Sequence, residues 1–327
     1  MPYTVNPLAG RDLLRLLDLA PDEFELIINV ACALKAAWAA DAAAAQARAP
    51  FAGQAVGVIL EKPSLRTRVS FERAIYRLGA QPIVMSDTSS AFSRGESIKD
   101  TMMVMERYVD TVVMRSFAQS RVEEVAWWSS VPVINALTDD FHPCQGLADL
   151  MTVYECFGSL RGVKLAYLGD GANNMAHTYL EAGALAGMQV VIAAPRAYQP
   201  NAEYLAQAVA IAGKTGALLS VTESVEEALD GAQVVVTDSW ASMGFEAEHA
   251  EREAALSGYQ VSAQSFAGAA DDAVFLHCLP AHRGEEVTDE VMDAPYSRIY
   301  DEAENRMHVQ QALLLLLMSG SEPDLPI

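Results

Sequence analysis

The chain is organised around the stretch Glu61-Lys62-Pro63-Ser64-Leu65-Arg66-Thr67-Arg68, which joins a buried strand to a helix. The preceding run, residues 55–60, is short, apolar and rich in branched side chains, as is typical of a strand covered on both faces. Pro63 ends that strand. Apolar positions at helical spacing across residues 69–78, followed by Gly79, then predict a helix. The sequence therefore places Ser64 to Thr67 at a helix N-terminus.

A helix N-terminus of this composition suits an anion. Its unpaired amide N–H groups and the positive end of the helix dipole favour negative charge. The hydroxyls of Ser64 and Thr67 and the guanidinium of Arg66 can add charge-assisted hydrogen bonds to phosphate oxygens. A capped surface helix with two solvated arginines fits the same residues. The local chemistry alone leaves phosphate binding and plain capping both open.

The composition bounds the class of protein. A length of 327 residues, of which 51% are hydrophobic and 20% charged, indicates two globular domains of ordinary size. The formal net charge of -21 and a pI near 4.6 argue against a nucleic-acid partner, which requires a basic face. An anionic substrate would therefore need positive charge concentrated locally.

Targeting signals and cysteine usage indicate a cytoplasmic protein. The N-terminus has no basic-then-apolar segment like a signal peptide, and no apolar run is long enough to span a bilayer, so we expect no membrane partner. The leucine run at 313–317 reads as part of a buried terminal helix. The cysteines are widely spaced without a CxxC pair, which fits a reducing compartment.

Alternating strands and helices predict the fold class. Residues 11–48 predict two helices, of which the second, Ala31 to Ala47, is rich in alanine. Later segments alternate between apolar strands and helices, which indicates an α/β protein with two doubly wound parallel-sheet domains. Besides residues 55–60, the predicted strands are 82–85, 111–114, 131–135, 163–168, 190–192, 217–219, 234–236 and 274–276.

Polar residues stand at several predicted strand ends, where open parallel sheets bind ligands. Arg115 ends the strand at 111–114 and would project into such a crevice, although a solvated strand-end charge fits as well. The turn Gly169-Asp170-Gly171-Ala172-Asn173-Asn174 superficially resembles a dinucleotide fingerprint but lacks the third glycine. We therefore expect no nucleotide at that turn.

Two further strand ends carry Asp238 and the pair His277-Cys278. Asp238 could cap a helix or hold a substrate amine, and both remain open. Cys278 as a covalent nucleophile needs an activating base that the sequence cannot place, so a buried neutral thiol is the default. The spacings His277-Cys278 and His142-x-Cys144 fit no usual structural zinc pattern. We expect neither a metal nor a cofactor.

Several motifs occur in the order seen in ornithine carbamoyltransferases, and the combination carries a resemblance that no single motif carries. It runs from about residue 50 to the last helix and identifies the chain as a member of the aspartate/ornithine carbamoyltransferase superfamily. The motifs are Ser64-Leu65-Arg66-Thr67-Arg68, Arg115, His142-Pro143-Cys144-Gln145, Asp238-x-x-x-Ser242-Met243-Gly244, His277-Cys278-Leu279-Pro280 and Asp301-Glu302-Ala303-Glu304-Asn305-Arg306.

The resemblance implies an enzyme with its active site in the cleft between the two domains. Residues 1–140 would bind carbamoyl phosphate, with the terminal helix, about 304–318, packing back on that domain, and residues 141–303 would bind ornithine. The reaction would give L-citrulline and phosphate, in arginine biosynthesis or in ornithine breakdown. The assembly would be a homotrimer or a multiple of trimers, with sites at subunit interfaces.

The same resemblance implies residue roles for carbamoyl phosphate. Arg115 would reach its phosphate and its carbonyl oxygen, His142 would hydrogen-bond the carbonyl oxygen, and Arg306 would close the site. With Cys278 as a possible proton acceptor, Arg115 and His142 are the expected catalytic residues. The phosphate would be bound by Ser64, the Leu65 backbone, Arg66 and Thr67, and the carbamoyl NH2 by Gln145 and the backbone carbonyls of Cys278 and Leu279.

For ornithine, the resemblance implies that Asn174 holds the carboxylate and Asp238 the α-amine. Ser242 and Met243 would belong to a loop that shuts over the substrate. Asp238 would repel the dicarboxylate of an aspartate carbamoyltransferase. Putrescine needs no carboxylate anchor such as Asn174, and an N-acylated ornithine masks the amine that Asp238 binds. These rivals remain open, as does a non-catalytic anion-binding protein.

Two positions depart from the family pattern. Leu65 stands where many members have threonine, but a backbone amide contact survives this change. Ala91 stands where many relatives carry a glutamine that reaches a neighbouring subunit's phosphate. Ser90, Ser93 or Arg94 would have to substitute for it. This hypothesis fails if replacement of Arg94 by alanine leaves the apparent affinity for carbamoyl phosphate unchanged.

Overall fold

The computed structural model describes residues 6–86, 95–240 and 249–320. The chain forms two compact units, which we call unit 1 (Met1–Met151 with Glu304–Ile327) and unit 2 (Thr152–Ala303). It passes between them within α6 (Pro143–Phe157) and again within α13 (Ile299–Met318). The boundary expected from the sequence lies at residue 140, before α6, because a helix that continues through a boundary shows no change of composition there.

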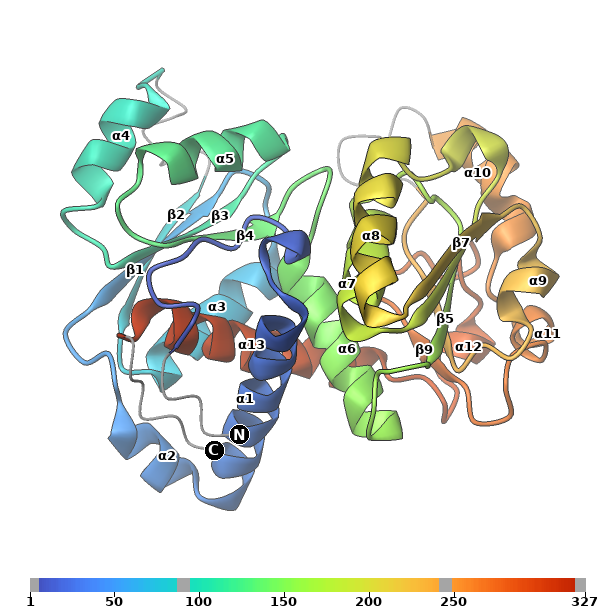
Figure 1. The fold of residues 1–327 in the computed structure, drawn as a ribbon, viewed down its shortest axis with the longest axis horizontal. Coiled ribbons are helices and arrows are strands. Elements are labelled where there is room, and N and C mark those ends of the chain that lie inside the picture. The colour runs from blue at the N-terminus through green and yellow to red at the C-terminus, as the bar shows by residue number, and fades with distance from the viewer. Residues whose placement is uncertain (1–5, 87–94, 241–248, 321–327) are drawn as a thin grey trace. The chain divides into compact units, whose positions relative to one another are not determined.

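Unit 1 is built on a four-stranded parallel sheet in the order β2-β1-β3-β4. Helices α4 and α5 cover one side of this sheet, and α3 and α13 lie on the other (Figure 1). The strands are β1 (Ala55–Leu60), β2 (Gln81–Ser86), β3 (Thr111–Arg115) and β4 (Val133–Leu137). The helices are α1 (Pro21–Ala40), α2 (Ala42–Arg48), α3 (Leu65–Arg77), α4 (Ile98–Met105) and α5 (Gln119–Trp128), with a 3-10 turn at Leu16–Asp18.

Alternation along β1 explains how the helices cover both faces. Ile59 packs in one cluster with Met102 of α4 and Val122 of α5, and a Cβ on Gly57 would meet Met105 at 3.1 Å. Residues at the other parity, such as Val58, point to the opposite face and are also fully buried. The strand is therefore apolar at nearly every position, as parallel sheets require.

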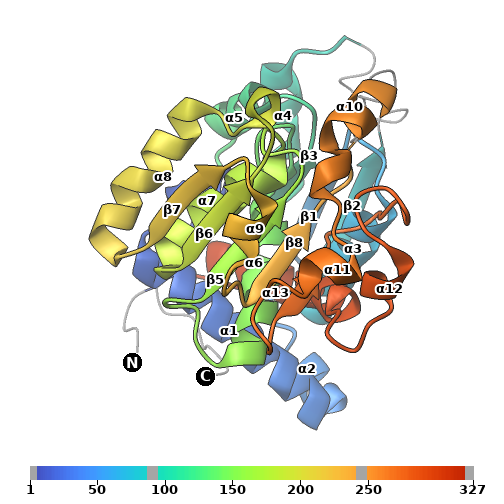
Figure 2. The same ribbon diagram turned by 90° about the vertical axis from the view of Figure 1, so that its right-hand side faces the viewer.

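Unit 2 contains a five-stranded parallel sheet in the order β7-β6-β5-β8-β9. Helices α7 and α8 lie on one side of it, and α9, α11 and α12 lie on the other (Figure 2). The strands are β5 (Lys164–Leu168), β6 (Gln189–Ala193), β7 (Leu218–Thr222), β8 (Val234–Thr237) and β9 (Val274–Leu276). The helices are α7 (Asn174–Ala186), α8 (Ala202–Thr215), α9 (Val225–Leu229), α10 (His249–Leu256), α11 (Ala263–Phe266) and α12 (Asp289–Met292), with 3-10 turns at Arg196–Tyr198 and Ser257–Tyr259.

The prediction of two doubly wound parallel-sheet domains is confirmed, but several helix boundaries were wrong. The first helix begins at Pro21 rather than near residue 11. The N-terminal helix does not break near Ala31. It continues to Ala40, and the next helix begins after Asp41, whose Oδ1 accepts from the N–H groups of Ala43 and Ala44. The last helix begins at Ile299 rather than at 304. Alanine-rich sequence gives no stop signal, so an N-cap aspartate decides the break.

Each sheet has one switch point, where strand order reverses and ligands bind in such folds. In unit 1, β1 is followed by β2 on one side and by β3 on the other. In unit 2, β5 is followed by β6 and β7 on one side and then by β8 on the other. The segments that leave the C-terminal ends of β1, β3, β5 and β8 therefore meet at these two points. They carry Ser64, Arg115, Asn174 and Asp238 among the residues singled out by the sequence.

Among the residues that the structure describes, no helix is both long and apolar enough to cross a membrane.

Candidate active site

The unit 1 half of the candidate site begins where β1 gives way to α3. Ser64 has extended backbone angles and is the N-cap of α3, and its Oγ accepts from the Thr67 N–H at 3.2 Å. The same Oγ donates to Thr67 Oγ1 at 3.0 Å. The expected helix start is therefore correct. The Leu65 side chain is 76% exposed, so only its backbone bears on this N-terminus.

Thr67 Oγ1 is the point on which three polar side chains converge. Arg306 Nη2 lies 3.1 Å from it and Arg115 Nη1 lies 3.4 Å from it, in addition to the Ser64 contact. Thr67 is fully buried, and both arginines are nearly so. The hydroxyl therefore fixes the two guanidinium groups at the helix N-terminus.

Arg115 reaches this point because β3 is irregular at its end. The register between β3 and β4 shifts between Met114 and Arg115, so that Met114 pairs with Asn135 and Arg115 with Leu137. An extra residue in one strand re-aims the side chain beside it. Arg115 thus lies near Thr67 while it remains paired to β1 opposite Leu60.

His142 and Gln145 stand at the N-terminus of α6, beside the same arginines. Arg306 Nη1 donates to Gln145 Oε1, whose Nε2 donates to Asp149 at 2.7 Å. Burial, and then the positive charges of Arg306, Arg115 and Arg66, hold the pKa of His142 well below its usual value. His142 is therefore a neutral imidazole, and the three arginines supply local positive charge in a chain of net charge -21.

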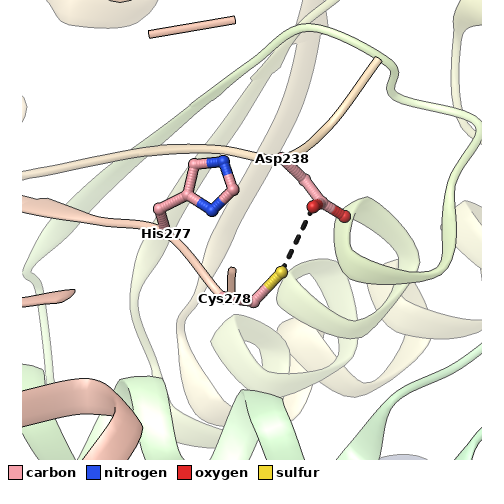
Figure 3. A group of neighbouring side chains, drawn as sticks. All are labelled: Asp238, His277 and Cys278. Atoms are coloured by element: carbon pink, nitrogen blue, oxygen red, sulfur yellow. Dashed lines mark hydrogen bonds between the residues drawn. The ribbon is translucent and has the colours of Figure 1, made fainter. Parts of the chain in front are cut away.

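In unit 2, the candidate site begins at Asp238, directly after β8. Asp238 Oδ1 accepts from Cys278 Sγ at 3.2 Å and from the Ser239 N–H at 2.7 Å (Figure 3). Its other oxygen accepts from Asn173 Nδ2 at 3.3 Å. Burial raises the pKa of Asp238, whereas His277 and the hydrogen bond from Cys278 lower it by a smaller amount. A cation bound here would stabilise the charged carboxylate.

Asn173 is a site residue that the sequence analysis did not identify. Its Oδ1 caps α7 by accepting from the Ala176 N–H at 2.9 Å, and its Nδ2 also lies 2.7 Å from the Tyr167 hydroxyl. Asn174 is the first residue of α7. An Asx residue just before a helix is a capping signal. That signal predicts a capping role for Asn173, as distinct from the carboxylate-binding role expected for Asn174.

Figure 3 shows Asp238, His277 and Cys278 drawn together, and their potential ligand atoms lie within 4.8 Å of one another. His277 Nδ1, however, accepts from the Leu279 N–H at 2.9 Å, and its Nε2 lies 3.1 Å from Glu286 Oε1. Both ring nitrogens are thus engaged, so metal binding would have to break one of these contacts. We assign no metal to this group.

A second group of possible ligands, His282, Glu285 and Glu286, also lies within 4.8 Å. The His282 side chain is 43% exposed, and Glu285 already accepts or shares a hydrogen bond with His249 at 3.0 Å. The three residues range from the exposed His282 to the buried Glu286. The absence of a metal stays a prediction.

The structure thus distributes the predicted residues over both units. Ser242 and Met243 lie outside the described residues, as do Ser90, Ala91, Ser93 and Arg94. Unit 1 brings together Ser64, Leu65, Arg66, Thr67, Arg115, His142, Gln145 and Arg306, and unit 2 holds Asn174, Asp238, Cys278 and Leu279.

Known families match both units separately. Residues 11–155 match the model of the aspartate/ornithine carbamoyltransferase carbamoyl-P binding domain, and residues 161–317 match that of the Asp/Orn binding domain. The chain belongs to the aspartate/ornithine carbamoyltransferase family.

Similar members of this carbamoyltransferase family match over nearly their full length. The chain is 47% identical to an ornithine carbamoyltransferase of Symbiobacterium thermophilum, with 96% of this chain and 100% of that protein covered. It is 49% identical to one of Clavibacter sepedonicus, with 95% and 99% covered. The solved ornithine carbamoyltransferase of Pyrococcus furiosus superposes with a TM-score of 0.91 at 43% identity, with 95% and 98% covered.

Within the carbamoyltransferase family, the two domain models divide the chain near the boundary between unit 1 and unit 2. The first covers the helix N-terminus at Ser64 together with His142, and the second covers Asp238. The second also extends through α13 to residue 317, although the structure assigns Glu304 onward to unit 1. The difference arises because a family model covers one continuous stretch of sequence, whereas α13 packs in unit 1 although it follows unit 2 in the chain.

Proposed function

We propose that this chain transfers the carbamoyl group from carbamoyl phosphate to the δ-amine of L-ornithine, giving L-citrulline and phosphate. The observation that carries the choice of substrate is Asp238, a buried carboxylate at the switch point of unit 2. A carboxylate there attracts the α-amine of ornithine and repels the second carboxylate of aspartate. The full-length likeness to proteins named ornithine carbamoyltransferase supports the same choice.

In this proposal, carbamoyl phosphate binds at the N-terminus of α3. The phosphate accepts from Ser64, the Leu65 amide, Arg66 and Thr67, and Arg115 bridges it to the carbonyl oxygen. Free backbone N–H groups and guanidinium forks are strong donors to phosphate. Support comes from the convergence of Arg115 and Arg306 on the Thr67 hydroxyl, which orders both guanidiniums before a ligand arrives. Preordered donors lose less entropy on binding.

The reacting centre needs stabilisation of negative charge. As the amine attacks the carbamoyl carbon, charge develops on the carbonyl oxygen, and Arg115, Thr67 and His142 donate to it. The lowered pKa of His142 supports a neutral imidazole, which can donate one hydrogen bond to this oxygen. Removal of one preorganised donor of this kind typically lowers the rate by ~10²–10³.

The attacking δ-amine must be neutral. An amine with a pKa of about 10.4 is less than ~0.1% neutral at pH 7, so the site must select or generate this form by desolvation. Asp238 binds the α-amine, Asn174 the carboxylate, and Ser242 and Met243 cover the ligand. Gln145 and the backbone carbonyls of Cys278 and Leu279 accept from the carbamoyl NH2 group, and Arg306 closes the site. The proton leaves toward the Cys278 region or the departing phosphate.

A substrate panel tests the proposal. The purified protein is assayed with carbamoyl phosphate and, in parallel, L-ornithine, N-acetylornithine, putrescine or aspartate, with detection of the carbamoylated product. We expect preference for ornithine by about a hundredfold or more in kcat/KM, which corresponds to about 2.7 kcal/mol. Preference for another amine would overturn the role of Asp238. No turnover with any amine would favour a non-catalytic anion-binding protein.

The cellular setting and assembly belong to the same proposal. The enzyme is a cytoplasmic homotrimer, or a multiple of trimers, and serves arginine biosynthesis or ornithine breakdown. The four free, widely spaced cysteines support a reducing compartment. Light scattering on the purified protein measures the assembly directly, and a monomer of 35.2 kDa would contradict the trimer.

A further inference from the structure

The segment that follows β9 is held in place by contacts from several elements of unit 2. Leu279 donates its N–H to His277 Nδ1 at 2.9 Å, and the Pro280 carbonyl accepts from Ser239 Oγ at 2.7 Å. Cys278 Sγ donates to Asp238 Oδ1 at 3.2 Å. The backbone of this segment is therefore held both by the residues that follow β8 and by His277 of the segment itself.

His277 makes the contact that bears directly on the Leu279 backbone. Because Nδ1 accepts from the Leu279 N–H, the ring N–H lies on Nε2, which donates to Glu286 Oε1 at 3.1 Å. The His277 N–H donates to Glu302 Oε2 at 2.8 Å. His277 is only 1% exposed. Its ring is thus engaged on both sides, and its Nδ1 holds the Leu279 backbone.

Glu286 links the two ends of the segment. Its Oε1 receives both the His277 ring proton and the His282 N–H, the latter at 2.6 Å. The side chains of Glu286 and His277 are both fully buried. Displacement of either end breaks one of these hydrogen bonds, at a cost of about 1–3 kcal/mol. The arrangement therefore resists displacement of either end.

Leu279 is the residue that needs this support. Its φ is +59°, in the left-handed region that residues with a Cβ adopt at a cost of about 1–2 kcal/mol. Strained backbone persists only where its surroundings hold it, and it concentrates at functional sites. The acceptor that His277 offers to the Leu279 N–H stabilises this conformation over the ordinary extended one.

We propose that His277, oriented by Glu286, is a positioning residue that sets the direction of the Cys278 and Leu279 carbonyls. This inference rests on the proposed function, in which these carbonyls accept from the carbamoyl NH2 group. Rotation of the Leu279 backbone to a negative φ would change the angle between the two peptide groups, so that the two carbonyls could not both keep that direction. A misplacement of about 1 Å at a reacting group lowers turnover by about a hundredfold.

A pair of substitutions separates the two contacts of the His277 ring. His277→Asn keeps an oxygen near the position of Nδ1, so it can accept from Leu279, but loses Glu286. His277→Gln reaches the position of Nε2 and Glu286, but loses the acceptor for Leu279. We expect His277→Gln to lower kcat by about a hundredfold and His277→Asn by less than about tenfold. KM for ornithine should change by less than about threefold in both.

Controls distinguish positioning from a general loss of stability. The thermal unfolding midpoint and the hydrogen exchange of peptide 276–282 are measured for each variant. We expect faster exchange of that peptide in His277→Gln but not in His277→Asn. His282→Gln serves as a matched control, because its side chain is 43% exposed and its backbone N–H to Glu286 is retained. That variant should keep the activity and exchange of the unchanged protein.

Each outcome decides the proposal. Equal kcat in the two His277 variants at equal stability would overturn it. Should His277→Gln fail to fold, Ser239→Ala tests the same claim from the β8 side, because it removes the donor to the Pro280 carbonyl. We then expect several-fold lower kcat and faster exchange, and no change in either would overturn the proposal. Absence of turnover in the unchanged protein would instead contradict the proposed function.

Discussion

Arg306 donates to the hydroxyl of Thr67 at 3.1 Å, although 239 residues separate the two positions in the sequence. Arg306 lies on α13 and Thr67 in the first turn of α3. The last helix therefore contributes a charged donor to a site whose other unit 1 residues come from the first half of the chain. The contact suggests tests of how the site is assembled.

Arg306→Met should raise the KM for carbamoyl phosphate by about ten- to hundredfold, because a hydrogen bond from a charged group is worth about 1.5–3 kcal/mol. Steady-state kinetics at saturating ornithine measures the change. Arg68→Met is the matched control, since Arg68 is exposed and pairs only with Glu72 among the contacts described. Equal KM values for the two variants would contradict a role for Arg306 in binding.

Thr67→Val should lower kcat/KM for carbamoyl phosphate by about ten- to hundredfold, while Thr67→Ser should stay within about threefold. Valine matches the shape of threonine but leaves the donors of Arg115 and Arg306 without this acceptor. Serine keeps the oxygen. If valine and serine behaved alike, the hydroxyl would not be what orders the arginines.

Asp238→Asn should raise the KM for ornithine by about ten- to hundredfold and leave that for carbamoyl phosphate within about threefold. The amide keeps an oxygen for Cys278 and the Ser239 N–H but loses the charge that attracts the α-amine in the proposed function. Measurement with N-acetylornithine gives the control, because an acylated amine carries no charge to lose. A parallel rise for both amines would argue against the assignment.

His142 predicts how stability depends on pH. Its pKa is held well below the ordinary value of 6.5 by burial and by three arginines. Between these two pKa values the unfolded chain binds a proton that the folded chain does not, so the free energy of unfolding should fall as the pH drops below about 6.5. Denaturant unfolding of unit 1 at pH 8 and pH 5.5 measures this. His142→Asn should reduce the slope.

Gly79→Ala should destabilise unit 1 by at least about 1–2 kcal/mol. Gly79 has a φ of +84°, and an added Cβ would lie 2.8 Å from the Cβ of Ala49. Gly213→Ala is the control, because that glycine lies inside α8 with nothing within 4 Å, and alanine there should stabilise by about 0.5–1 kcal/mol. Denaturant unfolding compares the two variants, and a stabilised Gly79→Ala protein would be the contrary result.

Local pattern was sufficient to predict most of the fold. The apolar run at 55–60 is strand β1 to the residue, because a strand buried on both faces tolerates few polar positions. Gly79 stops α3 as expected, since its left-handed backbone follows the helix cap at Leu78. The break at Asp41 was missed because alanine favours helix on either side, and only the capping hydrogen bonds reveal it.

The candidate site was predictable as residues but not as contacts. Motifs named Thr67, Arg115 and Arg306, yet sequence cannot show that one hydroxyl receives both guanidiniums. That arrangement depends on the register shift at the end of β3 and on the path of α13. The role of Glu286 was missed for the same reason. An acidic residue in a loop gives no sign of burial until the histidine that it binds is located.

Unit 1 consists of two pieces of chain, and this affects its folding during synthesis. A ribosome releases Met1–Met151 first and all of unit 2 next, so unit 2 has its whole sequence before unit 1 does. Val309, Ala312, Leu313 and Leu316 are fully buried and are translated near the end. The nascent first unit must therefore wait, with an apolar surface uncovered, until α13 emerges. A chaperone that shields this surface would act on the part of the chain that is synthesised first rather than on the part that is emerging from the ribosome.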